Sequence, residues 1–281
     1  MLLHRCLNTC KNMRPTLNKL LLLRAASLGI LFFASTANAE EFIAKYDASW
    51  SGITIGEMNL RVKEDAQNYE YHVGLNSLGL LKQFTQYKST NISKGTFSGA
   101  EVIPTSYYTY WQRKKEKQQI DIAYTNNGKT VRETANPPEK RWKRPEVEPK
   151  DKDNTLDPVT TALVLRKKVR EIIESGQALP AKVTMPVFDS RRRFDVELVV
   201  NGFKKVTYQG KEQEMLQISF FRTPLVGWND KELARYKQQD PKITFYLNAD
   251  YMPAFGSGEA PFGKAIFELV SYCKATEIAC K

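Results

Sequence analysis

Three carboxylates that could act together lie close in the sequence: Asp189, Asp195 and Glu197. Asp195 and Glu197 are two positions apart in a stretch where apolar and polar residues alternate, so we expect them to share one face of a strand. Glycosidases use pairs of carboxyl groups, one as the acid and the other as the base or nucleophile. A hydrolase that acts on a glycan through paired carboxylates is therefore one function that the sequence permits.

Two basic stretches could contact anions. Arg191, Arg192 and Arg193 follow Asp189 directly after one serine, and guanidinium forks match the oxygens of phosphate and carboxylate groups. The alternative is that this run forms a turn between two strands. The second stretch is Lys140-Arg141-Trp142, which could rest on an anionic membrane surface or form a solvated linker with Trp142 packed on a neighbour.

Histidine is nearly absent, which restricts the chemistry. Residues 40–281 contain one histidine, His72, on the polar side of an expected strand. A Ser-His-Asp triad or a two-histidine metal site cannot be assembled without it. Residues 256–263, GSGEAPFG, loosely resemble a phosphate loop but lack the Gly-Lys-Ser/Thr ending, so we expect a hairpin or loop there. We therefore expect no catalytic constellation, no metal and no cofactor.

Residues 13–39 have the pattern of a secretory signal. A basic start precedes an apolar stretch over residues 20–34, and the segment ends in Ala-Asn-Ala, whose two small residues suit signal peptidase. We expect cleavage between Ala39 and Glu40, and a periplasmic protein that is not a lipoprotein, because no Leu-x-x-Cys motif precedes this site. An uncleaved anchor is the alternative, but it needs roughly 20 uninterrupted apolar residues. Translation could start at Met1 or at Met13.

The cysteines and the net charge fit an exported chain. Cleavage after residue 39 leaves Cys273 and Cys280, seven positions apart, and an oxidising compartment allows them to pair. A metal site is the alternative, but it would need more ligands than these two. Cleavage also removes five of 42 basic residues and no acidic ones, so 37 remain against 31 acidic residues, a net charge of +6. This mild positive charge favours an anionic envelope surface over nucleic acid.

Period-two alternation of apolar residues predicts strands throughout the chain. It is clearest at residues 58–62, 69–75, 120–124, 194–200 and 243–247. Residues 156–176 instead have the helical period, with Asp157 as N-cap, Pro158 at the first position and Gly176 as a stop. We predict a mainly β fold: a strongly curled antiparallel sheet, an open barrel or spiral, packed on one helix of about four turns.

These patterns divide the chain into a signal peptide and one β-rich domain. The expected parts are the signal peptide 1–39, an N-terminal half 40–135, a charged exposed loop 136–154, the helix 157–175, a C-terminal half 180–272 and a disulfide-closed tail 273–281.

Four segments carry a resemblance to a known family. They are YDASWSGITIGEMNLRV (46–62), LDPVTTALVL (156–165), PVFDSRRRFDVELVV (186–200) and TFYLNADYMPAFGSGEAPFGKAIFELVSY (244–272). The chain resembles the domain of unknown function 3108, a family of exported bacterial proteins. It is also distantly similar to periplasmic curled-sheet lipoprotein carriers and to spiral-sheet envelope-integrity proteins. The resemblance implies a curved antiparallel sheet around a helix and a periplasmic location, and it transfers no functional residues.

A curled sheet of amphipathic strands has a concave apolar face, which one helix either fills or leaves partly open. If it is open, we expect the space to suit an acyl chain or an apolar peptide segment. The expected lining residues are Tyr69, Tyr71, Phe194, Val196, Phe245 and Leu247. The favoured function is a non-catalytic periplasmic protein that supports the cell envelope by binding a lipidic or amphipathic component or a protein partner, with the glycan hydrolase as the alternative.

Overall fold

The computed structural model describes residues 40–138, 144–238, 242–260 and 263–274, which belong to one compact unit. Three sequence predictions lie outside the described residues: the signal peptide, the Lys140-Arg141-Trp142 stretch and Cys280.

Within the described ranges, thirteen strands form a single antiparallel sheet, in the order β7-β6-β5-β4-β3-β2-β1-β13-β12-β11-β10-β9-β8. The N-terminal half is the meander β1 (Glu40–Trp50), β2 (Ile53–Glu64), β3 (Asn68–Ser77), β4 (Lys88–Ser98), β5 (Glu101–Arg113), β6 (Glu116–Thr125) and β7 (Thr130–Asn136). The C-terminal half is β8 (Ala181–Phe188), β9 (Arg193–Tyr208), β10 (Lys211–Val226), β11 (Ile243–Leu247), β12 (Pro253–Ala260) and β13 (Gly263–Lys274). The two halves join where β1 pairs with β13, so the first and last strands are neighbours in the middle of the sheet.

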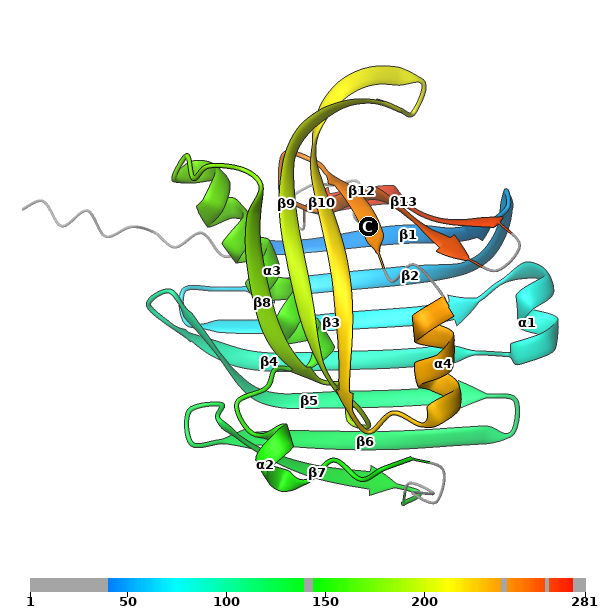
Figure 1. The fold of residues 1–281 in the computed structure, drawn as a ribbon, viewed down its shortest axis with the longest axis vertical. Helices are drawn as coiled ribbons and strands as arrows, with labels where there is room; N and C mark the ends of the chain where they lie inside the picture. The colour runs from blue at the N-terminus through cyan, green and yellow to red at the C-terminus, as the bar shows by residue number, and fades with distance from the viewer. Residues whose placement is uncertain (1–39, 139–143, 239–241, 261–262, 275–281) are drawn as a thin grey trace, which may run out of the picture. The chain divides into compact units, whose positions relative to one another are not determined.

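The sheet curls because its strands are apolar on one side only. In β6, for example, Ile120, Ile122 and Tyr124 are buried while the residues between them are more exposed. A flat sheet of this length would leave that apolar side in water. Figure 1 shows the result: β8, β9 and β10 cross in front of the N-terminal strands, and β7 and β8 are the two edges among the strands that the structure describes. The predicted mainly β, curled antiparallel fold is confirmed.

The helix α3 (Pro158–Glu174) follows the predicted signals closely. Asp157 caps it by accepting hydrogen bonds from Val159 N and Thr160 N, and Gly176 follows it with a φ of +69°, which suits glycine. Its buried residues divide between the halves of the sheet. Val159 and Leu163 pack in the core of the N-terminal half, and Leu165, Val169 and Ile172 pack with β9, β10 and β11. The helix therefore fills part of the space that the curled sheet encloses.

Three boundaries differ from the prediction. The stretch 136–154 is not a wholly exposed loop, because it contains the short helix α2 (Pro149–Lys152) and the buried Val147. Residues 256–260, which we expected in a hairpin or loop, continue β12. Gly256 pairs with Phe245 on the neighbouring strand, and its lack of a side chain leaves room for the Phe245 ring. Residue 263 begins β13, which extends to Lys274, so the tail starts later than residue 273.

Two further short helices, besides α2, were not predicted within the described residues. α1 (Gly79–Thr85) connects β3 to β4, and α4 (Asp230–Gln238) follows β10. The start of α4 is a reciprocal cap: Asn229 Oδ1 accepts from Glu232 N at 2.9 Å, and Glu232 Oε2 accepts from Asn229 N at 3.1 Å. This cap fixes the first turn of α4, and Tyr236 OH of the helix donates to the backbone oxygen of Arg222 on β10.

Candidate functional site

A cavity of about 570 Å³ lies between α3 and the inner face of the sheet. Both halves of the sheet and the helix form its walls. The lining includes Tyr46, Met58, Leu60, Tyr71 and Val73 from β1–β3, Ala162, Leu165, Arg166 and Val169 from α3, and Val187, Phe194, Val196, Leu198, Ile218 and Phe220 from β8–β10. The walls are thus almost wholly apolar, and they join residues far apart in the sequence.

The cavity exists because the helix side chains facing it do not fill it. Ala162 lines the cavity and remains exposed on α3, and the apolar side chains of Met58, Val73 and Val196 are only half-buried. Large apolar side chains on an inner sheet face normally bury fully against the opposite layer. Space is therefore left where a small residue on the helix meets the curled sheet.

Arg166 is the charged side chain in this lining. Its guanidinium donates to Glu40 Oε1 at 2.9 Å and to the backbone oxygen of Asp250 at 3.1 Å, and it lies 5.3 Å from the centre of the Phe42 ring. Its side chain is 10% exposed. Arg166 thus links α3 to the start of β1 and to the turn before β12, and its charge is balanced within the protein.

A buried polar network fixes the beginning of α3. Asp157 is fully buried, and its carboxylate accepts hydrogen bonds from Thr160 Oγ1 at 2.6 Å and from Ser93 Oγ on β4 at 3.1 Å. Tyr69 OH lies 2.9 Å from Thr160 Oγ1. Burial raises the pKa of Asp157, and the hydrogen bonds from Thr160, Ser93 and Val159 act in the opposite direction. The network anchors the helix to β3 and β4.

Four of the six expected lining residues do line the cavity: Tyr71, Phe194, Val196 and Leu247. Tyr69 instead belongs to the Asp157 network. Phe245 packs edge-on against Phe220 and Phe267, with ring centres 5.6 and 6.1 Å apart, and lines a second pocket.

The three carboxylates of the hydrolase hypothesis each have a partner. Asp189 accepts from the backbone of Arg192 at 2.8 Å and forms an ion pair with its side chain at 2.9 Å. Asp195 pairs with Arg193 at 2.7 Å. Glu197 pairs with Lys182 on β8 at 3.2 Å.

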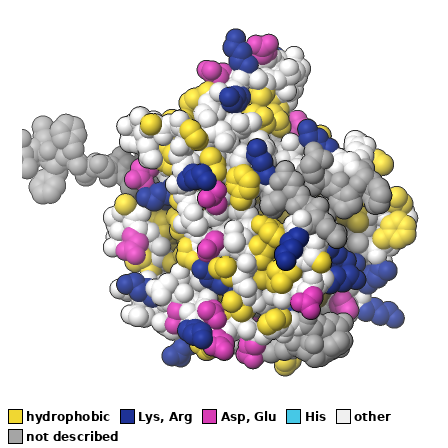
Figure 2. Space-filling model, in the orientation of Figure 1, with side chains coloured by type: hydrophobic (Ala, Val, Ile, Leu, Met, Phe, Trp, Pro, Cys, Tyr) yellow, Lys and Arg dark blue, Asp and Glu magenta, His cyan; other side chains and the backbone are white. Residues whose placement is uncertain are grey.

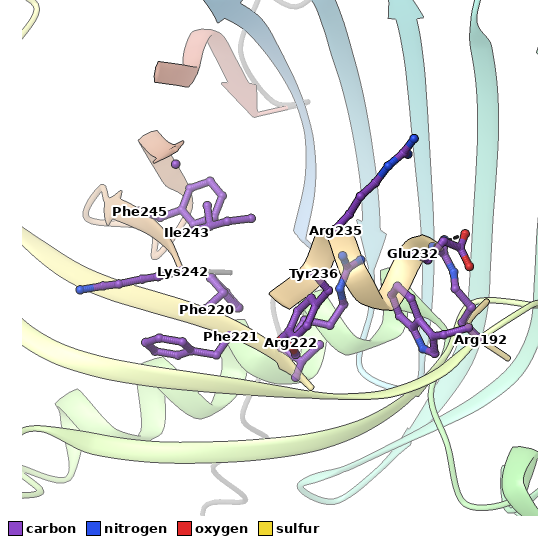
Figure 3. A pocket seen from close by; sticks show the side chains of 13 residues that line it. Arg192, Phe220, Phe221, Arg222, Glu232, Arg235, Tyr236, Lys242, Ile243 and Phe245 are labelled. Carbon is purple, nitrogen blue, oxygen red and sulfur yellow. Dashed lines mark hydrogen bonds and ion pairs between the residues drawn. The ribbon is translucent and has the colours of Figure 1, made fainter. Parts of the chain in front are cut away.

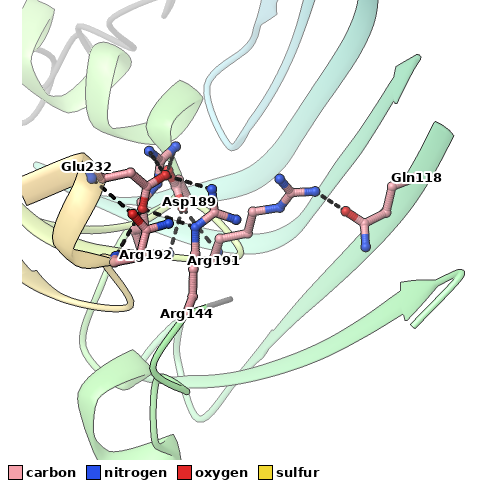
Figure 4. Close-up of polar contacts among 7 residues, drawn as sticks. Gln118, Arg144, Asp189, Arg191, Arg192 and Glu232 are labelled. Atoms are coloured by element: carbon pink, nitrogen blue, oxygen red, sulfur yellow. Dashed lines mark hydrogen bonds and ion pairs between the residues drawn. The ribbon is translucent and has the colours of Figure 1, made fainter. Parts of the chain in front are cut away.

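Arg191 and Arg192 lie in the turn between β8 and β9, and Arg193 is the first residue of β9. Figure 4 shows the internal contacts of Arg191 and Arg192. Arg191 donates to Gln118 on β6 and lies 5.0 Å from the Trp111 ring centre. Arg192 reaches Glu232 on α4 at 3.8 Å, and Arg144 binds the same carboxylate at 2.6 Å. These contacts support the turn interpretation, in which the arginines join separate parts of the fold. His72 likewise contacts Glu70 on the same strand.

A second pocket of about 630 Å³ adjoins the cavity, because Val196 and Phe220 line both. Figure 3 shows it between β10 and α4, with Arg222 and Tyr236 close together and Arg235 extending away from them. On the surface over β10 and α4, apolar side chains lie beside lysines and arginines (Figure 2). This pocket is therefore both aromatic and cationic.

Sequence reasoning missed Arg222 and Trp228, which line this second pocket. A signal for Arg222 was present: Ile218, Phe220 and Arg222 alternate along β10, so an apolar row ends in a cation. Trp228 lies just after the end of β10, next to Gly227, where the sequence has no alternation of apolar and polar residues. Among the described residues, no group of three or more His, Cys, Asp or Glu is placed to hold a metal ion. No helix in the described ranges combines the length and apolarity needed to cross a membrane.

The fold and the site define a class of protein: a curled antiparallel sheet with an internal helix and an apolar cavity between them. The chain belongs to the family described as "Protein of unknown function (DUF3108)", which matches residues 45–270. The resemblance drawn from the sequence is thus confirmed.

Two solved structures match the chain. The first is a beta-barrel-like protein of the domain of unknown function DUF1849 from Brucella abortus, with 13% identity, a TM-score of 0.50, and coverage of 85% of this chain and 99% of that one. The second is a DUF1089 family protein from Pseudomonas aeruginosa, with 6% identity, a TM-score of 0.27, and coverage of 77% and 90%. No curated protein matches the chain. The first likeness supports the curled fold.

Proposed function

We propose that this protein is a non-catalytic binding protein that holds a lipidic or amphipathic molecule in the cavity between α3 and the sheet. The cavity itself carries the proposal: about 570 Å³ with half-buried apolar side chains on its walls. Ligand sites in proteins typically measure roughly 300–1,000 Å³ and are mostly apolar with a few polar groups. An acyl chain placed there would remove the exposed parts of Met58, Val73 and Val196 from water, which is favourable.

The location that we propose is the periplasm, with a role in maintaining the cell envelope. It is supported by the signal sequence at residues 13–39, by the net charge of +6 after cleavage and by the two cysteines of the remaining chain. Envelope lipids would supply ligands of the proposed kind, and an anionic membrane surface would attract the basic protein.

The hydrolase alternative has less support. A general acid needs a carboxyl group free to exchange a proton with the substrate, whereas Asp189, Asp195 and Glu197 each hold a cation at 2.7–3.2 Å.

The test is binding of N-phenyl-1-naphthylamine, an uncharged probe that fluoresces in apolar surroundings, to delipidated protein. We expect saturable binding, and at least a tenfold weaker affinity in Ala162→Trp, because the indole would occupy the cavity. The matched control is Ala123→Trp, which adds the same bulk at an exposed position of β6. It should bind like the wild type. No saturable binding, or equal binding by Ala162→Trp in its folded form, would overturn the proposal.

A further inference from the structure

The inner row of β10 changes from apolar to cationic where the cavity meets the second pocket. Ile218, Phe220 and Arg222 are alternate residues of the strand and so point to the same side. Arg222 is in register with Val196 on β9, and Phe220 with Leu198. A molecule lying along this row would therefore contact apolar side chains first and a guanidinium next.

Arg222 has aromatic neighbours and, unlike Arg166 and Arg192, makes no ion pair with a carboxylate of the described residues. Its guanidinium lies 4.9 Å from the ring centre of Trp228 and 5.6 Å from that of Phe194. Arg192 lies 4.7 Å from the same Trp228 ring, but it is paired with Asp189 at 2.9 Å. Within the described part of the chain, no carboxylate lies within 4.0 Å of the Arg222 guanidinium.

The surroundings of Arg222 disfavour its charge. Arg222 is exposed to solvent as a whole residue. Partial burial of its guanidinium and the nearby charge of Arg192 nevertheless lower the pKa of Arg222, and the more distant carboxylates of Asp189 and Glu232 offset this in part. Two guanidiniums beside one indole ring leave a local excess of positive charge. An anion at this position would form charge-assisted hydrogen bonds with Arg222 and relieve the repulsion.

The cavity and the cationic pocket are continuous, since Val196 and Phe220 belong to the walls of both. We propose that the ligand is a single-chain anionic amphiphile, with its acyl chain in the cavity beside α3 and its carboxylate or phosphate bound by Arg222 next to Trp228. This inference rests on the proposed function and adds to it the charge and the orientation of the ligand.

The test compares ligands that carry the same oleoyl chain and differ in the head group. Uncharged monoolein, oleate and oleoyl lysophosphatidate are each used to displace N-phenyl-1-naphthylamine from the wild-type protein. We expect both anionic ligands to displace the probe at roughly tenfold lower concentration than monoolein, as one charge-assisted contact would give. The anion that displaces the probe at the lower concentration shows whether the pocket prefers carboxylate or phosphate.

Variants of Arg222 test whether this residue causes the preference for anionic ligands over monoolein. Arg222→Gln should remove the preference for anions and leave monoolein binding unchanged, whereas Arg222→Lys should retain most of it. The control is Arg61→Gln, which removes one guanidinium from an exposed position of β2 and should keep the preference. Because Arg222→Gln could fold poorly, raising the salt concentration with the wild type is a second measurement: it should weaken oleate binding and not monoolein binding.

The two proposals fail in different ways. If neither the probe nor monoolein binds, the cavity is not a ligand site and the proposed function is wrong. If monoolein binds as well as oleate and lysophosphatidate do, or if folded Arg222→Gln weakens all three ligands equally, the cavity binds apolar chains and the anion inference is wrong.

Discussion

Ser93 Oγ lies 3.1 Å from the carboxylate of Asp157, which joins β4 to the cap of α3 across 64 positions of the chain. The same carboxylate accepts from Thr160 Oγ1 and from the backbone of Val159 and Thr160. One side chain thus starts the helix and fixes it to the sheet.

Replacing Asp157 with alanine should destabilise the protein by about 3 kcal/mol. The loss of an N-cap costs roughly 1 kcal/mol, and the buried hydroxyls left without an acceptor cost a further 1–3 kcal/mol, roughly. Urea unfolding measures this change. Asp121→Ala, at an exposed position of β6, should change stability by less than about 0.5 kcal/mol. A change at Asp157 as small as this would show that the network does not hold the helix.

Glu232 should make part of the stability depend on pH. The hydrogen bond from Arg144 lowers the pKa of Glu232, opposed by burial and helped by Asn229 and Arg192. A carboxyl group with a lowered pKa in the folded state stabilises above its ordinary pKa, and this contribution is lost as the pH falls through the folded-state value.

Glu232→Gln should therefore lose about 1–2 kcal/mol at neutral pH, on the scale of a charged hydrogen bond, and progressively less below about pH 4. Urea unfolding of the wild type and of Glu232→Gln, at neutral pH and below about pH 4, measures this difference in stability. Glu174→Gln, which alters an exposed carboxylate at the end of α3, is the control for the loss of one negative charge. An equal loss at both pH values would contradict the assignment.

Cys273 lies in β13 opposite Ile43 of β1, and its expected partner Cys280 lies outside the described residues. In protein isolated from the periplasm we expect the two to be oxidised to each other. The intact mass after alkylation should then increase only when reductant is added first. Closing so short a loop should contribute about 2–3 kcal/mol, so Cys273→Ser and Cys280→Ser should be destabilised alike. Two freely alkylated thiols would refute the disulfide.

Signal processing is a further prediction. The mature protein should begin at Glu40, as its intact mass would show, and should appear in the periplasmic fraction. Ala39→Asp should block cleavage, because signal peptidase requires a small side chain at that position. Asn38→Asp introduces the same carboxylate at the intervening position and should still be processed. Retention of residues 1–39 on the wild-type protein would support an anchor instead.

The strands and the long helix could be predicted because their signals are local. The alternation at Ile120, Ile122 and Tyr124 can be recognised from neighbouring residues alone. The same holds for the start of the helix at Asp157 and Pro158 and for its end at Gly176. The reciprocal cap of α4, from Asn229 to Glu232, is equally local, but it begins a helix of only nine residues, too short to give a long periodic signal.

The site was less predictable because its geometry depends on the curl. Tyr71 and Val196 line one cavity although they are 125 positions apart, and Phe245 and Leu247 share a strand face yet meet different neighbours. Arg222 was missed for the same reason: its neighbours Trp228 and Arg192 come from the segment after β10 and from the turn before β9. Residue type alone cannot reveal such neighbours.

The pairing of β1 with β13 places the seam of the sheet between the strands that are made first and last. Until β13 is synthesised, one edge of β1 is unpaired, although β1 to β7 can already pair with one another. An exposed strand edge is open to pairing with other chains. The edge of β1 therefore stays open until β13 pairs with it, and a chaperone that shields β1 would act mainly in that interval.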